Sequence, residues 1–157
     1  MNKYLETKGF IFDEIETNGK VVLATCNNNQ VAARTISVIV HDNKIYFQTD
    51  LRMDKAKEIE KNNNVAICIG SIQIKGTCKH IGKPAHIKWF VDKYKNKYPN
   101  AFALYSRLEY ERVFEIEPTS AKVWTYIQGE PYIKVIDFEK KEYVCNRYLD
   151  RGENYEL

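Results

Sequence analysis

The stretch "KIYFQTDLRMDKAKEIEKNNNVAI", residues 44–67, decides how this chain folds. Residues 45–49 are rich in β-branched and aromatic side chains, which predicts a strand. Residues 51–62 then place apolar side chains at helical spacing on one side, which predicts a short amphipathic helix. Three asparagines end that helix, and residues 65–70 are apolar at nearly every position. We therefore expect a second, central strand that is covered on both faces.

Outward from this stretch, β-rich runs bounded by Asn, Gly and Pro predict seven further strands. They are expected over Val21–Cys26, Val31–Val40, Ile72–Ile81, Val113–Glu117, Val123–Ile127, Tyr132–Phe138 and Tyr143–Tyr148. Helices are expected from residue 10 to 18, from Pro84 to Tyr98, and over residues 101–107. Strands dominate and most are joined by short turns, while the helices fall between groups of strands. This order predicts a mainly β fold, an antiparallel, Greek-key-like β-barrel with peripheral helices.

The composition limits the classes of function. A length of 157 residues, 44% of them hydrophobic, fits one globular domain spanning residues 1–157, with a loose tail at 151–157. A net charge of +3 without a long Lys/Arg run predicts no nucleic-acid partner. No apolar run is long enough to span a membrane, and the first residues lack a signal-peptide core. Four cysteines without a Cys-x-x-Cys pair predict reduced, buried thiols in a cytoplasmic protein.

Arg34 is the first candidate for a binding residue. Along the expected strand 31–40 its side chain shares a face with Ala32, Ile36 and Val38. A guanidinium in an apolar row needs a counter-anion, because an unpaired buried charge is costly. That anion is either a carboxylate from another strand or a ligand phosphate, which arginine binds through two parallel hydrogen bonds.

Thr49 and Lys55 mark the junction between the strand and the short helix. The free N–H groups and the dipole of a helix start attract anions. A lysine on such a helix is usually only solvated, so Lys55 alone means little. Because residues 31–40 and 45–49 should form a hairpin, we expect Arg34 to lie near Thr49. Arg34, Thr49 and Lys55 could then converge on one phosphate.

Other reactive side chains form no clear site. Cys78 and His80 share a strand face, but the set of ligands is incomplete, so we predict no metal site. The tyrosines of the helical segment 84–107 are expected mostly in the core, with the substrate side of a site as the alternative. The sequence singles out no catalytic acid or base. Because the sequence has no Gly-x-Gly-x-x-Gly motif, any nicotinamide is expected to bind only transiently and not as a tightly held cofactor.

Residues 33–69, "ARTISVIVHDNKIYFQTDLRMDKAKEIEKNNNVAICI", resemble the flavin-binding segment of the pyridoxamine-phosphate-oxidase-like superfamily. Residues 72–82, "IQIKGTCKHIG", resemble the next strand of that superfamily, and residues 114–124, "FEIEPTSAKVW", resemble its closing element. The resemblance spans roughly residues 10–127, the expected core, and leaves residues 130–148 as added C-terminal strands. It implies an FMN-binding split β-barrel.

The resemblance also implies how FMN is held. Arg34 and Lys55 would bind the phosphate with help from Thr49. Four residues would lie along the ribityl chain and the isoalloxazine ring: Thr35, Ile36, Phe47 and Gln48. The family is usually a homodimer with FMN at the interface, so Trp124 could contact the flavin of the neighbouring subunit. A core or interface tryptophan is the alternative.

The activity implied by the resemblance is that of an FMN-dependent oxidoreductase. It would take electrons from NAD(P)H and pass them to a small organic acceptor, as in small bacterial members linked to nitroimidazole resistance. The chain departs from the family pattern at Thr35 and Asn64, where proline is common, and at Asp54, where a second cation is common. Residues 135–157 also lack the Arg-rich substrate motif of true pyridoxamine-phosphate oxidases. The alternatives are a flavin carrier or sensor without turnover, a haem-binding split barrel, or one without a cofactor.

Overall fold

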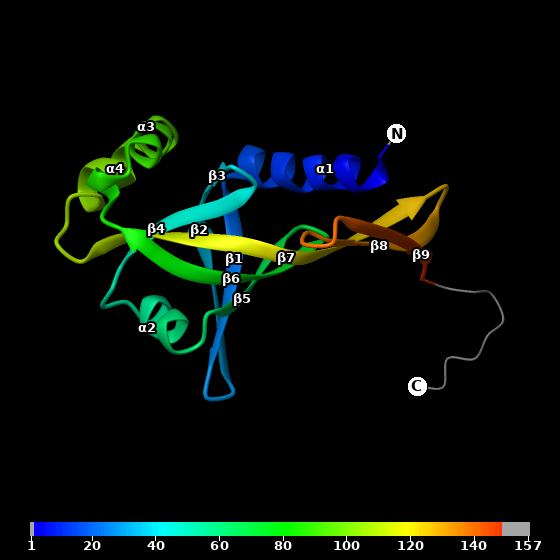
Figure 1. Cartoon of the computed structure of the whole chain (residues 1–157), viewed down its shortest axis with the longest axis horizontal. Helices are drawn as coiled ribbons and strands as arrows, with labels where there is room; N and C mark the ends of the chain where they lie inside the picture. The colour runs from blue at the N-terminus through cyan, green and yellow to red at the C-terminus, as the bar shows by residue number, and fades with distance from the viewer. Residues whose placement is uncertain (1, 149–157) are drawn as a thin grey trace.

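The computed structural model describes residues 2–148, so the tail predicted at 151–157 lies outside the described residues. The described part contains four α-helices, one 3-10 helix and nine strands (Figure 1). The helices are α1 (Lys3–Asn18), α2 (Asp54–Lys61), the 3-10 helix η1 (Pro84–His86), α3 (Lys88–Lys97) and α4 (Pro99–Tyr105). The strands are β1 (Lys20–Asn27), β2 (Gln30–Ser37), β3 (Ile39–His41), β4 (Lys44–Asp50), β5 (Asn64–Ile69), β6 (Ile72–Gly82), β7 (Glu111–Ile127), β8 (Glu130–Asp137) and β9 (Glu142–Arg147).

Every strand pairs antiparallel with its neighbours. The order is β2-β1-β5-β6-β7-β4-β3, and β8 and β9 continue outward from β7. The 17-residue strand β7 links both parts, since its first half pairs with β4 and its second half with β8. This arrangement confirms the predicted mainly β, antiparallel barrel with peripheral helices.

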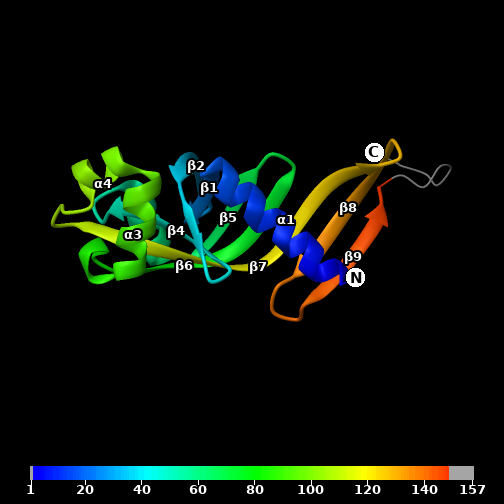
Figure 2. The ribbon, with the colours of Figure 1, turned by 90° about the horizontal axis from the view of Figure 1, so that it is seen from above.

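The helices cover different parts of the sheet. Helix α1 lies over one side and α2 lies on the other, while α3 with α4 and the β8–β9 hairpin occupy opposite ends (Figures 1 and 2). The main core is built from α1, α2 and the inner faces of the strands, with Ile11, Leu23 and Phe47 among its most buried side chains. A second, smaller core beneath α3 contains Tyr46, Phe90, Tyr94 and Val113. Tyr94 is therefore a core residue, as expected.

Helix α1 begins well before the predicted start at residue 10. Asn2 caps it, because its side-chain oxygen accepts a hydrogen bond from the Leu5 amide at 3.2 Å. The helix ends as predicted at Asn18-Gly19, where Gly19 takes the left-handed conformation with φ 69°. The early turns were missed because the cap lies seven residues before the apolar stripe becomes regular.

The predicted strand 31–40 is two strands, and this changes what it pairs with. The chain breaks at Val38, whose amide donates to the Gly19 carbonyl at 2.8 Å. Only residues 39–41 pair with β4, whereas β2 pairs along its whole length with β1. The prediction that residues 31–40 and 45–49 form one hairpin, placing Arg34 beside Thr49, is therefore wrong. Arg34 lies opposite Leu23 of β1 instead.

The predicted strands 113–117 and 123–127 are one continuous strand, β7. Pro118 fits inside it because the register with β6 shifts between Lys75 and Gly76, a β-bulge. Gly76 has no room for a side chain there, since an added Cβ would lie 2.5 Å from the Glu117 carbonyl oxygen. A bulge of this kind leaves only a weak trace in the sequence.

Two smaller expectations also need correction. Strand β5 is central, but it is not covered on both faces, because Cys68 is exposed on its outer side. The predicted helix from Pro84 to Tyr98 divides into η1 and α3, and Pro99 begins α4.

Candidate functional site

Arg34 lies on the inner face of β2, against α2. Its Nη2 is 3.1 Å from Oε1 of Glu58, and its Nη1 donates to Oγ1 of Thr25 at 2.8 Å. A weaker contact of 3.4 Å joins Nη1 to the Leu23 carbonyl. Of the two counter-anions predicted for Arg34, the structure shows the carboxylate, although it comes from a helix and not from another strand. The guanidinium remains partly accessible, with 24% of the side chain exposed.

Lys55 lies near Arg34, in the first turn of α2. Burial lowers the pKa of the Lys55 ammonium, and the nearby guanidinium of Arg34 lowers it further. Within residues 2–148 the ammonium forms no hydrogen bond or ion pair. The structure thus brings the two predicted cations together, but through the packing of β2 against α2 and not through the expected hairpin.

The start of α2 adds hydrogen-bond donors to these cations. The N-cap residue Met53 offers no side-chain acceptor to the first turn of the helix. Uncapped N–H groups and the helix dipole favour an anion at this place. Asp54 opposes this effect with its own negative charge. A cavity of about 300 Å³ opens beside Arg34 and is bordered by Asp54, Lys57 and Glu58.

The remaining residues predicted for the cofactor take different orientations. Thr49 is buried at the end of β4 and bonds to neither cation. Ile36 and Phe47 belong to the main core, while Thr35 is exposed on the outer face of β2. The side chain of Gln48 accepts a hydrogen bond from Oγ of Ser106 at 2.7 Å. Its Nε2 is buried without a partner in the described part of the chain.

Trp124 lies at the other end of the molecule. Its ring packs edge-on against Tyr148 at 4.7 Å and against Tyr126 at 6.2 Å. It is separated from the first residue of β7, Glu111, by 13 positions along one strand, which is roughly 40 Å. Trp124 therefore cannot reach Lys55 of its own chain.

Glu111 belongs to the site but was missed by the sequence reasoning. Its side chain is buried, and burial together with the nearby carboxylate of Asp50 raises the Glu111 pKa to about 7. The ammonium of Lys55 acts in the opposite direction. The sequence did contain one indication that Glu111 is buried. Side chains alternate between the two faces of a strand, so Glu111 shares a face with the buried Val113 of β7.

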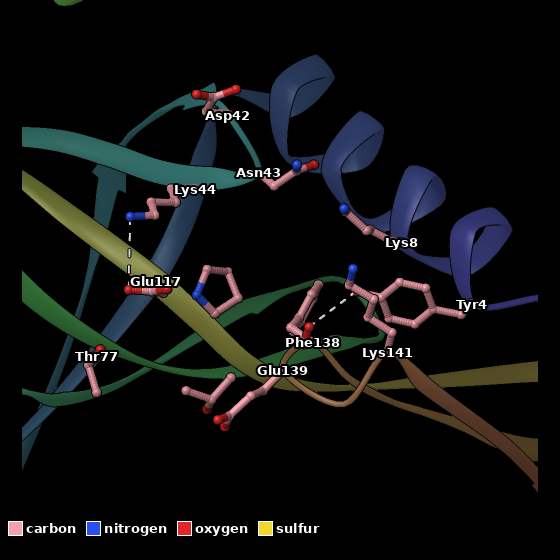
Figure 3. Close-up of a pocket in the computed structure, with 12 residues that line it drawn as sticks. Tyr4, Lys8, Asp42, Asn43, Lys44, Thr77, Glu117, Phe138, Glu139 and Lys141 are labelled. Carbon is pink, nitrogen blue, oxygen red and sulfur yellow. Dashed lines mark hydrogen bonds and ion pairs between the residues drawn. The ribbon is translucent and has the colours of Figure 1, made fainter.

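A separate cavity of about 510 Å³ lies between α1 and the β8–β9 turn (Figure 3). Tyr4 and Lys8 from α1 face Phe138 and Lys141 across it. The hydroxyl of Tyr4 donates to the Phe138 carbonyl at 3.5 Å. Lysines and carboxylates line this cavity in mixed order, so it has no clear charge preference, and it does not include the cations of the α2 site.

The cysteines and histidines form no metal site within residues 2–148. All four cysteines are free, but only Cys78 is buried, which raises the pKa of its thiol to about 12. The prediction of buried thiols therefore holds for Cys78 alone. Cys78 and His80 border a cavity of about 360 Å³ between α2 and β6. Over the same residues, the structure contains no helix with the length and apolar character needed to cross a bilayer.

The structure places this protein in the class of antiparallel split β-barrels, with two cations, Arg34 and Lys55, where β2 packs against α2. The family model for pyridoxamine 5'-phosphate oxidase matches residues 9–125, so the chain belongs to this family. This confirms the resemblance drawn from the sequence. No curated protein matches the chain.

Solved structures with the same fold include proteins with different cofactors. An FMN-binding, pyridoxamine 5'-phosphate oxidase-related protein from Nostoc punctiforme is 16% identical with a TM-score of 0.63, covering 90% of this chain and 96% of its own. ChuZ from Campylobacter jejuni is 10% identical with a TM-score of 0.74, over 100% of this chain and 68% of its own. The haem storage protein HutZ from Vibrio cholerae is 11% identical with a TM-score of 0.61, over 70% and 88%. At these identities the similarity shows the fold alone.

Proposed function

We propose that this protein binds FMN and acts as a homodimeric, flavin-dependent oxidoreductase on a small organic molecule. The observation that carries the proposal is the meeting of Arg34 and Lys55 beside the uncapped start of α2. A flavin phosphate carries close to two negative charges and three acceptor oxygens, which such a group of donors suits. Membership of the pyridoxamine 5'-phosphate oxidase family and the FMN-binding relative support the choice of FMN.

The residues present fit the phosphate end of FMN. Lys55 has no protein partner among the described residues, so its charge is available to a ligand. Arg34 contacts Glu58 through Nη2, and the remaining N–H groups of its guanidinium can donate to a ligand. When bound, FMN would supply the redox chemistry, accepting hydride from NAD(P)H and reducing the acceptor.

The proposed dimer would place a second subunit on the outer face of β1, β2 and β5. Small and apolar side chains lie there, and Val31 is 81% exposed. Ala24 pairs with Ala33 on one side and with Ala66 on the other, so small side chains at these positions would let a second subunit approach closely. In such a dimer Trp124 of one subunit would contact the flavin of the other. The four free thiols support a cytoplasmic location.

The phosphate anchor is tested by replacing both cations. Arg34→Ala with Lys55→Ala should weaken FMN binding at least a hundredfold, because each charge-assisted hydrogen bond contributes about 1.5–3 kcal/mol. Quenching of flavin fluorescence measures the affinity, and circular dichroism checks the fold. Lys8→Ala with Lys141→Ala removes the same charge elsewhere and should leave the affinity unchanged. Equal affinity in both double variants would place the site elsewhere.

Turnover separates an enzyme from a flavin carrier or sensor. The enzyme should oxidise NAD(P)H in a steady state when supplied with small electron acceptors such as nitroaromatic compounds. Flavin that stays bound but is never reduced would favour the carrier.

A haem site is the second candidate function. HutZ is a haem storage protein with this fold, and Cys78 and His80 border a cavity of mixed apolar and polar lining in the present chain. Absorbance of the purified protein decides between the cofactors. Flavin gives bands near about 370 and 450 nm and haem gives a Soret band, as the chemistry of each cofactor dictates.

A further inference from the structure

The carboxyl group of Glu111 is almost buried and has no direct partner among the described residues. Glu111 begins β7 directly opposite Asp50, the last residue of β4, and only 4% of the residue is exposed. Its amide donates to the Leu108 carbonyl at 3.2 Å, so the backbone is fixed. The carboxylate itself forms no hydrogen bond and no ion pair with any residue from 2 to 148. Each carboxylate oxygen keeps a small contact with solvent, but the loss of most of its surrounding water still makes the ionised form costly.

The other charges around Glu111 are already engaged. Asp50 is bound by Arg52, whose Nη2 lies 2.7 Å from Oδ2. Arg112 donates to the main-chain carbonyls of Glu109 and Glu111, both at 2.8 Å. Neither arginine forms a hydrogen bond or an ion pair with the Glu111 carboxylate.

Two side chains from the packed helices complete the surroundings. Tyr94 of α3 is buried near Glu111 and has a raised pKa, caused first by burial and then by the Glu111 charge. Lys55 of α2 feels the same carboxylate, which counteracts the lowering of the Lys55 pKa. Lys55 is therefore the cation whose charge offsets Glu111 when no ligand is present. The same ammonium is needed by the phosphate in the proposed function.

A phosphate at Lys55 changes this balance. The ammonium would then face both the phosphate and the Glu111 carboxylate, and the two negative groups would disfavour each other. Neutralising Glu111 with a proton removes that repulsion and also removes the cost of burying its charge. The raised pKa of Glu111 makes this step accessible near neutral pH.

We propose that Glu111 takes up one proton from solvent when the phosphate group of a ligand binds at Lys55, so that pH controls the affinity for phosphorylated flavin. The proton is added to a carboxylate oxygen, and no other bond is made or broken. Glu111 is thus a positioning residue that acts through Lys55. This inference rests on the proposed function, since it requires a phosphate at Lys55.

Calorimetry in two buffers of different ionisation enthalpy tests the proposal, because it counts the protons taken up when FMN binds. The wild-type protein should take up most of one proton per FMN near pH 7.5, and its affinity should fall severalfold per pH unit above 7. Glu111→Gln should take up almost none and bind FMN more tightly than the wild type at pH 8. The phosphate of FMN is itself almost fully ionised above pH 7, so it does not produce this slope.

Two controls isolate the effect. Glu109→Gln removes an exposed carboxylate two positions away and should behave like the wild type. Riboflavin lacks the phosphate, so its binding should involve no proton uptake in any variant. Equal proton uptake by wild-type protein and Glu111→Gln would overturn this inference while leaving the FMN site intact. Failure of the wild type to bind FMN would overturn the proposed function, and this inference with it.

Discussion

The charged side chains at the two ends of the paired strands β4 and β7 differ in whether they have direct partners. At one end, Lys44 lies 3.2 Å from Glu115, and the Tyr46 hydroxyl donates to the same carboxylate at 2.9 Å. At the other end, the charges of Lys55 and Glu111 bear on each other without a direct contact. We call these the paired end and the open end of the strand pair.

The difference separates charges that support the fold from charges that suit a ligand. At the paired end the acceptor oxygens of Glu115 have partners, and burial with this carboxylate raises the pKa of Tyr46. At the open end a half-buried ammonium and a buried carboxylate lack direct partners, which costs stability. Such unsatisfied groups mark functional sites more often than structural ones.

The largest expected effect is at the paired end. Glu115→Ala should lower the free energy of unfolding by about 2–3 kcal/mol, because it leaves the buried hydroxyl of Tyr46 without its acceptor and Lys44 with only the more distant Glu117. Urea denaturation measures this change. Glu117→Ala is the control, since Glu117 is 60% exposed and lies 3.9 Å from Lys44, and it should cost less than about 0.5 kcal/mol. A large loss of FMN affinity in Glu115→Ala would contradict the division between the two ends.

At the open end, removing a charge should raise the free energy of unfolding instead of lowering it. The folded-state pKa of Glu111, about 7, is above the value of an unfolded glutamate, about 4.3, so the wild type loses stability as pH rises between these values. Glu111→Gln removes this loss and should be more stable by about 2–3 kcal/mol at pH 8, but not at pH 4. Thermal melting across this range measures the difference. A constant offset at all pH values would mean that the pKa of Glu111 is the same in the folded and the unfolded protein.

Glu58 gives a smaller effect, on binding. Glu58 and a ligand phosphate compete for the Arg34 guanidinium, so Glu58→Gln should tighten FMN binding threefold to tenfold, about 1 kcal/mol. Fluorescence titration at constant ionic strength detects this gain. If Glu58 instead positions Arg34 for the phosphate, the affinity falls, and the competition would be excluded.

The smallest effect concerns Lys55 and stability. At pH 5, where Glu111 is protonated and needs no offsetting cation, Lys55→Gln should change the free energy of unfolding by less than about 0.5 kcal/mol, because the ammonium makes no direct contact in the described residues. Urea denaturation of the apo protein measures it, with Lys44→Gln as the matched lysine from the paired end. Should Lys55→Gln be the more damaging of the two, the open end would be structural.

Local patterns in the sequence predicted much of the fold. The helix after Thr49, the turn at Asp42-Asn43 and the strands on either side follow from residues close to one another in the chain. The pairing of β2 with β1 could not be read in this way, because Val38 breaks the strand through a bond to Gly19, 19 positions earlier. Arg34 and Lys55 do meet, but the predicted reason for their meeting is wrong.

The site was predicted less completely than the fold. Arg34 stands out because a charge interrupts an apolar row, whereas the same test does not single out Glu111, because Glu115 and Glu117 lie on its face of β7. The engagement of Arg34 by Glu58 depends on how α2 packs against β2, which no local spacing reveals. The placement of Trp124 far from Lys55 became visible only when two predicted strands proved to be one.

The bulge at Gly76 and Pro118 changes which positions of β7 face the main core. Before it, the even-numbered residues Phe114 and Ile116 point into the main core, and after it the odd-numbered Ala121 and Val123 do so. The extra residue of the bulge, Thr119, thus changes which residues of β7 face the core, from even-numbered to odd-numbered, without interrupting the strand. Deleting Thr119 would remove the bulge and restore regular alternation, because Pro118 and Ala121 would then be separated by one residue. Ala121 and Val123 would still face the main core and Trp124 would keep its side, but β7 would lose the bend that a bulge introduces.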